Sequence, residues 1–317
     1  MPGKKLLVGT MANSVGLPLQ RAEQAGYFKD AGLTVEVVVF ATGAPINEAM
    51  AAEELDLAVS GMASVYALAT GRYKYIGEGC ITIEGQTMFA RKDSPVALSK
   101  GVIAGTFGSA ATVKGASILG PLATSAHYLA IKYAESFGLS TDDFQMVSME
   151  FPQSYQAFVT GKGDLISTTP PYSMQLEDAG YVKVCDLTQV LGSPLVDANY
   201  AQNKVWKERR GDLLAFLDCY YRACKDLNDN PGMRKGIAKK WYAEEGKRYS
   251  DADLDSEAKR QTYPTLDMLL TPKFPFAFTM IAIGEFFAGQ GMIAKENLPN
   301  IKASLDSSLV EELKAKQ

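Results

Sequence analysis

The sequence offers few side chains for catalysis. It contains one histidine, His127, so a metal site built on several histidines is impossible and a Ser-His-Asp arrangement has one candidate base. No motif places a nucleophile or an orienting carboxylate beside His127, which favours a structural or ligand-contacting role. The phosphate-binding motifs GxGxxG and GxxxxGK[ST] are absent, and so is the nucleophile elbow GxSxG. We therefore expect a binding protein without a cofactor, a metal or a catalytic residue.

The polar residues best suited to contact a ligand follow predicted strands. These loops are rich in Ser, Thr, Gly and Asn, and several open a helix, where backbone N–H groups and the helix dipole attract anions. N-capping explains any one of them equally well, but the pattern recurs in both halves of the chain. The predicted ligand-binding residues are Asn13, Ser14, Thr42, Gly43, Ser60, Met62, Gln86, Thr124, Ser125, His127, Phe151, Thr169, Tyr172 and Asn199.

The charges of these loops restrict the ligand. They contain no Lys or Arg but do contain three acidic residues, Glu84, Glu150 and Asp197. A multiply charged anion is therefore poorly served, whereas a small monoanion, a taurine-like zwitterion or a neutral aromatic-bearing solute fits better. An anionic group is expected at the helix starts Thr124–Ser125 and Thr42–Gly43. An apolar wall, or alternatively part of the core, is expected from three aromatic residues, Phe151, Tyr155 and Tyr172.

Two stretches of alternating strands and helices position these loops. In residues 1–91 the pattern predicts strands at 6–10, 33–40, 57–60 and 80–91, and helices at 17–29, 45–54 and 63–70. The second stretch predicts strands at 116–120, 144–148, 164–167 and 181–186, and helices at 125–137, 154–160 and 174–179. Residues 204–317 are predicted to be mostly helical. The expected fold class is α/β, with two doubly wound lobes around a ligand cleft and a helical C-terminal part.

The lobe boundaries follow from the same pattern. Residues 1–93 together with about 200–317 are expected to form the first lobe, and residues 94–199 the second. A ligand that touches both lobes favours a closed state, so hinge closure is the expected mechanism.

Composition excludes several classes of protein. The 317 residues are 47% hydrophobic and 21% charged, which is typical of a soluble globular chain rather than a disordered one. No run approaches the ~20 apolar residues that span a bilayer. The net charge of -4 without a Lys/Arg block disfavours nucleic acid as a partner. The four cysteines form no CxxC motif and are expected to be buried free thiols.

Several segments carry a family resemblance. The first, Ala25-Gly26-Tyr27-Phe28-Lys29-Asp30-Ala31-Gly32-Leu33-Thr34-Val35-Glu36, is similar to the motif "GYFK..GL.VE" of the nitrate/sulfonate/taurine-type solute-binding proteins of ABC transporters, in the superfamily that includes the THI5-like proteins. The second, from Gly43 to Gly61, is similar to "SG…A…GE.D.A..G", although Glu53 replaces its second glycine. Weaker matches are Gly161-Lys162-Gly163-Asp164 and Pro170-Pro171-Tyr172.

This resemblance implies the type II periplasmic-binding-protein fold and the role of an extracytoplasmic receptor. Its partners would be a small solute, such as a sulfonate, a taurine-like compound or a carboxylate, and the membrane permease of an ABC importer. We expect a monomer. The sequence shows no secretory signal, which fits either a cytosolic protein or a mature form, and the resemblance favours the second. The alternatives are an enzyme of the same fold and a sensory ligand-binding module.

Overall fold

The chain folds into two compact units. The computed structural model describes residues 5–122, 124–170 and 172–316. Unit 1 comprises residues 1–81 and 196–317, and unit 2 comprises residues 82–195. The chain therefore passes from unit 1 to unit 2 and back once. The first division lies earlier than the predicted one at 93/94, because a strand at 87–90 pairs with strands of unit 2, and the second lies at 195/196 rather than near 199/200.

Unit 1 is built on a six-stranded sheet in the order β11-β4-β10-β3-β1-β2. β1 pairs in parallel with both β2 and β3, as the alternating pattern predicts, and β10 pairs antiparallel with β3. The strands are β1 (Leu6–Met11), β2 (Val35–Phe40), β3 (Leu57–Ser60), β4 (Tyr73–Thr82), β10 (Leu195–Gln202) and β11 (Gln261–Thr262).

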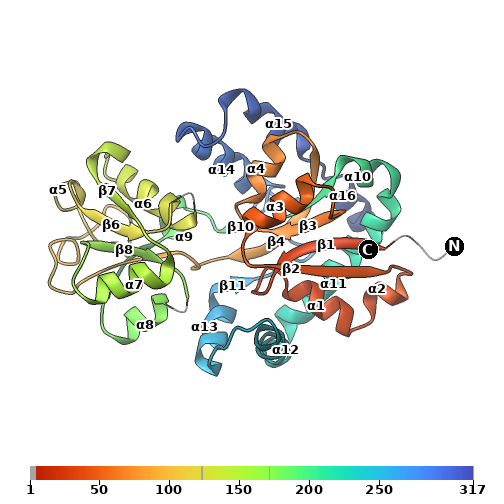
Figure 1. Cartoon of the computed structure of the whole chain (residues 1–317), viewed down its shortest axis with the longest axis horizontal. Helices are drawn as coiled ribbons and strands as arrows, with labels where there is room; N and C mark the ends of the chain where they lie inside the picture. Colours follow the sequence, from red (N-terminus) through yellow and green to blue (C-terminus); the bar gives the residue numbers. More distant parts are fainter. Residues whose placement is uncertain (1–4, 123, 171, 317) are drawn as a thin grey trace. The chain divides into compact units, whose positions relative to one another are not determined.

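Helices cover both faces of this sheet. Figure 1 shows α3, α4, α14 and α15 on one face and α1, α11, α12 and α13 on the other. The helices are α1 (Leu17–Gln24), α2 (Tyr27–Asp30), α3 (Gly43–Ala51), α4 (Ser64–Ala69), α10 (Asn203–Glu208), α11 (Arg210–Asp229), α12 (Pro231–Glu244), α13 (Asp251–Arg260), α14 (Phe278–Gly289), α15 (Leu298–Ser304) and α16 (Ser308–Ala315). Within the described ranges, none combines the length and the apolarity needed to cross a membrane.

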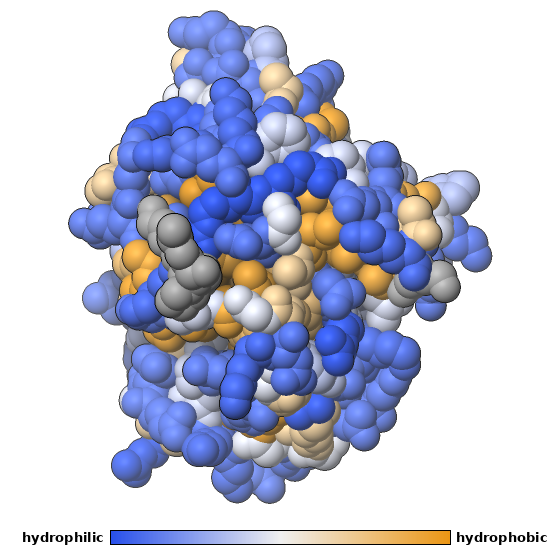
Figure 2. All heavy atoms as spheres, turned by 90° about the vertical axis from the view of Figure 1, so that its right-hand side faces the viewer, coloured by the Kyte–Doolittle hydropathy of each residue, from blue (hydrophilic) through white to orange (hydrophobic). Residues whose placement is uncertain are grey.

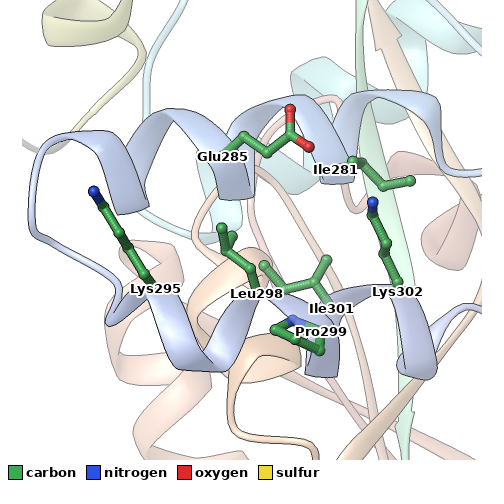
Figure 3. A pocket seen from close by; sticks show the side chains of 7 residues that line it. All are labelled: Ile281, Glu285, Lys295, Leu298, Pro299, Ile301 and Lys302. Atoms are coloured by element: carbon green, nitrogen blue, oxygen red, sulfur yellow. The ribbon is translucent and has the colours of Figure 1, made fainter.

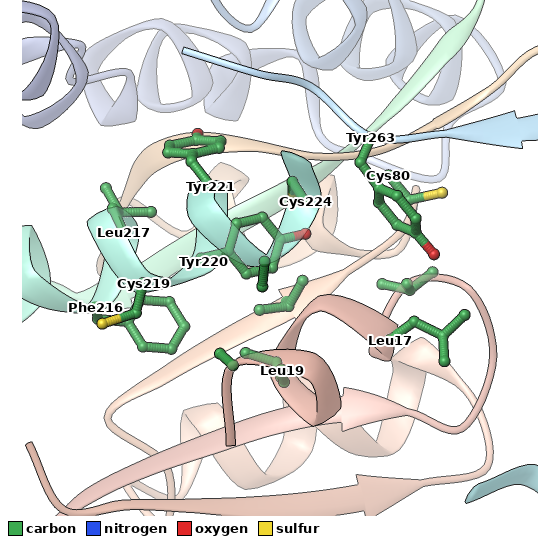
Figure 4. Packing of buried hydrophobic residues seen from close by; sticks show 14 of the residues in the cluster. Leu17, Leu19, Cys80, Phe216, Leu217, Cys219, Tyr220, Tyr221, Cys224 and Tyr263 are labelled. Atoms are coloured by element: carbon green, nitrogen blue, oxygen red, sulfur yellow. The ribbon is translucent and has the colours of Figure 1, made fainter. Parts of the chain in front are cut away.

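The core of unit 1 lies between the sheet and α11. Aromatic residues of α11 pack against leucines of α1 (Figure 4), and the ring of Phe216 stacks on that of Phe28 with 5.8 Å between centroids. Each such large apolar side chain stabilises the fold by ~1.5–3 kcal/mol when fully buried. The four cysteines are buried and free, as the sequence predicts.

The edge strand β2 is only partly covered. All of its residues keep some exposure, although Val35, Val37 and Val39 pack against the core. Figure 2 views the side of the molecule at the right of Figure 1, where hydrophobic residues reach the surface among hydrophilic ones. An apolar side chain at the surface is therefore not by itself a sign of a ligand site in this unit.

Unit 2 has a five-stranded sheet in the order β7-β6-β8-β5-β9. β6 pairs in parallel with β7 and β8, whereas β5 runs antiparallel to β8 and β9. The strands are β5 (Thr87–Ala90), β6 (Ser117–Gly120), β7 (Gln145–Ser148), β8 (Leu165–Thr168) and β9 (Val182–Asp186). The helices are α5 (Ala110–Val113), α6 (Ser125–Glu135), α7 (Phe151–Val159), α8 (Tyr172–Asp178) and α9 (Leu187–Leu191). The α/β class predicted from the sequence is confirmed.

Three local predictions are wrong. The single helix predicted over 17–29 is two helices, because Gly26 adopts a left-handed conformation (φ 75°) that ends α1 and restarts the chain as α2. The single strand region predicted over 80–91 is the end of β4 and the separate strand β5. The loop predicted over Asp197–Tyr200 lies inside β10.

Candidate functional site

Gln86 joins two elements of unit 2, the start of α6 and the end of β8. Its Nε2 donates to Ser167 Oγ (3.1 Å) and to the Thr168 carbonyl (3.0 Å), and Ser125 Oγ donates to its Oε1 (2.8 Å). Only 2% of Gln86 is exposed. The structure thus brings together two of the candidate residues, Gln86 and Ser125, but in a closed set of hydrogen bonds that ties the start of α6 to β8.

The hydroxyl groups at the start of α6 already donate to acceptors of the protein. Thr124 Oγ1 accepts from the Ala126 backbone N–H (3.2 Å) and donates to the Pro121 carbonyl (2.8 Å). Since a hydroxyl has one proton, neither Thr124 nor Ser125 has a free donor for an anion, which differs from the predicted role of both. His127 lies one turn into the helix, where burial lowers the pKa of its imidazole and favours the neutral form.

The aromatic candidates of unit 2 lie on α7 and at the start of α8. The rings of Tyr155 and Tyr172 have centroids 5.3 Å apart, and Phe151 opens α7. All three are partly exposed, and Tyr155 also packs against the core of the unit. Thr169 Oγ1 lies 3.3 Å from the Pro170 carbonyl. Positions 123 and 171, which neighbour the candidate residues Thr124 and Tyr172, lie outside the described residues.

In unit 1, Ser14 is enclosed rather than presented. It is 1% exposed, its backbone N–H donates to Glu257 Oε1 (3.2 Å), and its hydroxyl contacts Glu257 and Gln261. Asn13 Oδ1 accepts from the Val15 backbone N–H (3.0 Å) and shapes the turn after β1. These side-chain contacts hold the loop between β1 and α1 in place.

The start of α3 differs from the start of α6. Thr42, the N-cap residue, is exposed and its side chain makes no capping hydrogen bond. Ser60, at the end of β3, is fully buried, and its hydroxyl has no hydrogen-bond partner among the described residues. A Cβ at Gly43 would lie 3.2 Å from Ser60 Oγ and 2.6 Å from Ala63 Cβ, so glycine allows the helix start to approach this hydroxyl. Met62 lies partly exposed in the loop that follows.

The three acidic residues singled out in the sequence have different surroundings. Glu84 forms an ion pair with Lys183 (3.3 Å), and Glu150 is exposed before α7. Asp197 is partly buried in β10 and has no hydrogen-bond or ion-pair partner within the part of the chain that the structure describes. Loss of solvation raises the pKa of the Asp197 carboxyl to about 7.

Asn199 lies on the same strand as Asp197 and contacts the backbone of Glu78 on the neighbouring strand β4. Asn199, predicted in a loop, is fully buried in β10, and its Nδ2 donates to the Glu78 carbonyl of β4 (3.0 Å). Burial raises the pKa of the Glu78 carboxyl to about 7, although its Oε1 accepts from the Ala277 backbone N–H (2.9 Å). Sequence analysis did not select Glu78, which precedes the strand predicted at 80–91 but lies within β4 in the structure.

A cation that the sequence did not indicate reaches the loop after β1. Lys247 Nζ donates to the Ala12 carbonyl (2.8 Å), and partial burial lowers the pKa of this ammonium group. Lys247 and Ala12 are 235 positions apart in the sequence. A loop that contains no Lys or Arg therefore still lies beside a positive charge from a distant segment.

A surface hollow lies elsewhere in unit 1. It is lined by residues of α14, α15 and the segment between them, namely Ile281, Glu285, Lys295, Leu298, Pro299, Ile301 and Lys302 (Figure 3). None of the predicted ligand-binding residues lines it. The described residues also include no group of three or more His, Cys, Asp and Glu side chains that could hold a metal ion.

Comparison with known proteins identifies relatives over most of the chain. The NMT1-like family matches residues 1–241. A putative ABC transporter periplasmic binding protein from Brachyspira hyodysenteriae is 27% identical over 282 residues, which cover 88% of this chain and 81% of that protein. The resemblance stated from the sequence is therefore confirmed.

Solved structures share the fold at low sequence identity. The periplasmic aliphatic sulphonate-binding protein SsuA from Escherichia coli is 16% identical, with a TM-score of 0.74 over 94% of this chain and 91% of that one. The desulfurization enzyme DSZB is 14% identical, with a TM-score of 0.63 over 99% of this chain and 100% of that one. This fold thus serves both a binding protein and an enzyme.

Proposed function

Because the chain belongs to the NMT1-like family, we propose that it is the solute-binding receptor of an ABC importer. The observation that carries this proposal is the similarity to the periplasmic binding protein of Brachyspira hyodysenteriae over 88% of the chain. In this role the protein binds a small solute outside the cytoplasm, releases it unchanged to a membrane permease and catalyses no reaction.

The proposed solute is a small organic anion or zwitterion, with sulfonates as the first class to test. The start of α3 supports this choice, because it combines the positive end of a helix dipole with the unpartnered hydroxyl of Ser60. The name of the similarly folded SsuA protein supports the same class. We place the anionic group against Gly43 and Ser60 rather than at the start of α6, where the hydroxyl protons are already donated.

The first experiment identifies the cargo and tests for turnover. Native mass spectrometry of freshly purified protein should show a retained small molecule or, after addition of taurine or an alkanesulfonate, a mass increase equal to that compound. A bound solute at 100 times its Kd adds about 2.7 kcal/mol of stability, which a thermal-shift screen detects easily. An enzyme would instead convert the compound, which product analysis reveals. No bound species and no shift across sulfonates, carboxylates and amino acids would refute the receptor proposal.

A pair of variants tests the position of the anionic group. Ser60→Ala should raise the Kd of a bound sulfonate by about tenfold, since a hydrogen bond to a charged group is lost. Ser304→Ala is the matched control, because Ser304 is equally buried but donates to the Ile301 carbonyl of its own helix. Equal affinity of both variants would place the anion elsewhere.

Hinge closure stays a prediction from the sequence. Small-angle scattering with and without the bound compound tests it, and a decrease in the radius of gyration is the expected result. Tight binding without a change in the radius of gyration would contradict closure.

A further inference from the structure

The residues of β10 put unpaired hydrogen-bond acceptors on one face of the unit 1 sheet. Asp197 and Asn199 are two residues apart in a strand, so their side chains lie on the same face. The Asn199 amide must point its nitrogen at the Glu78 carbonyl, which can only accept. Its Oδ1 is therefore the free atom, and it is buried without a partner among the described residues.

Glu78 on the neighbouring strand carries an unpaired acceptor of its own, but its side chain does not belong to this group, because Gly79 faces Asp197 and successive residues of a strand point to opposite faces. Glu78 Oε2 is buried without a hydrogen-bond partner in the described ranges, although Oε1 of the same carboxylate is bonded. In Asp197 and Asn199, every unpartnered side-chain atom is an oxygen that accepts when the Asp197 carboxyl group is ionised. Acceptors without partners in or near the interior destabilise a fold, and retaining two of them on one face is expected where a ligand supplies the donors.

Asp197 packs closely against two glycines. A Cβ at Gly61 would lie 3.3 Å from Asp197 Oδ1, and a Cβ at Gly79 would lie 3.1 Å from Asp197 Cβ. Asp197 also keeps part of its surface exposed, unlike Asn199. The carboxylate is thus the member of the group that a solute can reach.

We propose that Asp197 binds a protonated amine of the transported solute, with Asn199 as a further acceptor on the same face. This inference rests on the proposed receptor function and narrows the solute to a compound that carries a cationic nitrogen. The Asp197 carboxylate repels an anionic group of the solute. A neutral hydroxyl group supplies one hydrogen-bond donor and no charge, whereas an ammonium group supplies three donors and a positive charge. A zwitterion offers its cationic group to Asp197 and its anionic group to the start of α3.

Matched pairs of compounds test the inference. Taurine and isethionate share a sulfonate and differ in an amine against a hydroxyl, and 3-aminopropanesulfonate and 3-hydroxypropanesulfonate form a second pair. β-Alanine and 3-hydroxypropionate form a pair without the sulfonate. Calorimetry on the full chain at pH 8 should give a Kd at least tenfold lower for the amine in at least one pair.

Variants test whether the Asp197 carboxylate causes the preference for the amine over the hydroxyl compound. Asp197→Asn keeps the shape and removes the charge, and it should bring the two members of the pair to within about twofold of each other. Asp30→Asn, at an exposed carboxylate of α2, should leave the preference unchanged. If Asp197→Asn does not fold, Gly61→Ala provides the second test, since the added methyl group crowds Oδ1 and should weaken amine binding by at least fivefold while isethionate is less affected.

The outcomes separate this inference from the receptor proposal. Binding of isethionate as tightly as taurine, or an amine preference that survives Asp197→Asn, would overturn the inference and leave the receptor proposal standing. The absence of binding by every compound, together with no retained cargo in native mass spectrometry, would refute the receptor proposal and this inference with it.

Discussion

The Asp197 carboxylate should lower the stability of the ligand-free protein at neutral and alkaline pH. Its folded-state pKa of about 7 exceeds the ordinary value of 3.8, so the folded protein holds the proton more tightly than the unfolded chain. The protonated carboxyl is therefore the form compatible with folding. Its contribution to stability is fully present below pH 4 and is lost as the pH rises through about 7.

The size of this effect follows from the difference between the two pKa values. A gap from 3.8 to about 7 corresponds to about 4 kcal/mol at most. Because Asp197 is partly exposed and water screens its charge, we expect about 1–3 kcal/mol. Asp197→Asn removes the ionisation, so this variant should be more stable than the parent by that amount at pH 8 and nearly equal to it at pH 4.5.

Urea unfolding of the parent and of Asp197→Asn at pH 4.5, 6, 7 and 8 measures this difference. Other groups that titrate in this range, such as Glu78, are present in both proteins and largely cancel. Asp30→Asn, the exposed control, should show a small difference that does not change with pH. A difference for Asp197→Asn that is independent of pH, or a variant that is less stable than the parent at pH 8, would show that a partner stabilises the carboxylate in the folded protein.

Further variants test the packing around the candidate residues. Gln86→Leu should destabilise unit 2 by about 1–3 kcal/mol in urea unfolding, since the buried Ser167 hydroxyl and Thr168 carbonyl lose a donor; an effect below 0.5 kcal/mol would mean that the network contributes little. Gly43→Ala should lower stability by about 1–3 kcal/mol, because its Cβ would meet that of Ala63 at 2.6 Å, and an unchanged melting temperature would contradict this packing. The four thiols, those of Cys80, Cys185, Cys219 and Cys224, should not react with Ellman's reagent in the native protein at pH 8 and should all react in 8 M urea. The reason is that burial raises their pKa values. Fast reaction in the native protein would contradict this.

The elements that the sequence predicted well are those in which local pattern and tertiary environment agree. β3 occupies residues 57–60 as predicted, because its four apolar or small residues are all buried and no competing signal interrupts them. β10 was missed because Asp197 and Asn199 have low strand propensity, and the pairing of β10 with β3 overrides that preference. The left-handed glycine that divides the first predicted helix is compatible with the sequence but not required by it.

The side-chain contacts of the candidate site were harder to predict from the sequence than the strands and helices. Strand-end loops could be located from the periodicity, but the partners of their side chains come from distant segments. Ser14 meets Glu257, 243 residues later, and Lys247 reaches Ala12. No local pattern encodes such contacts, so the sequence could not distinguish an engaged hydroxyl, as in Ser125, from an unpartnered one, as in Ser60.

The insertion of unit 2 into unit 1 bears on the order in which the chain folds during synthesis. Unit 2 is one continuous segment, so its sheet can form as soon as residues 82–195 have left the ribosome. The first 81 residues must wait, because β3 lacks β10 and Phe28 lacks Phe216 until the C-terminal segment emerges. Closing contacts across more than 100 residues is entropically costly and slow. The N-terminal segment is therefore expected to stay without its native core partners through much of translation, and a chain truncated before α11 should contain a folded unit 2 beside an unfolded unit 1.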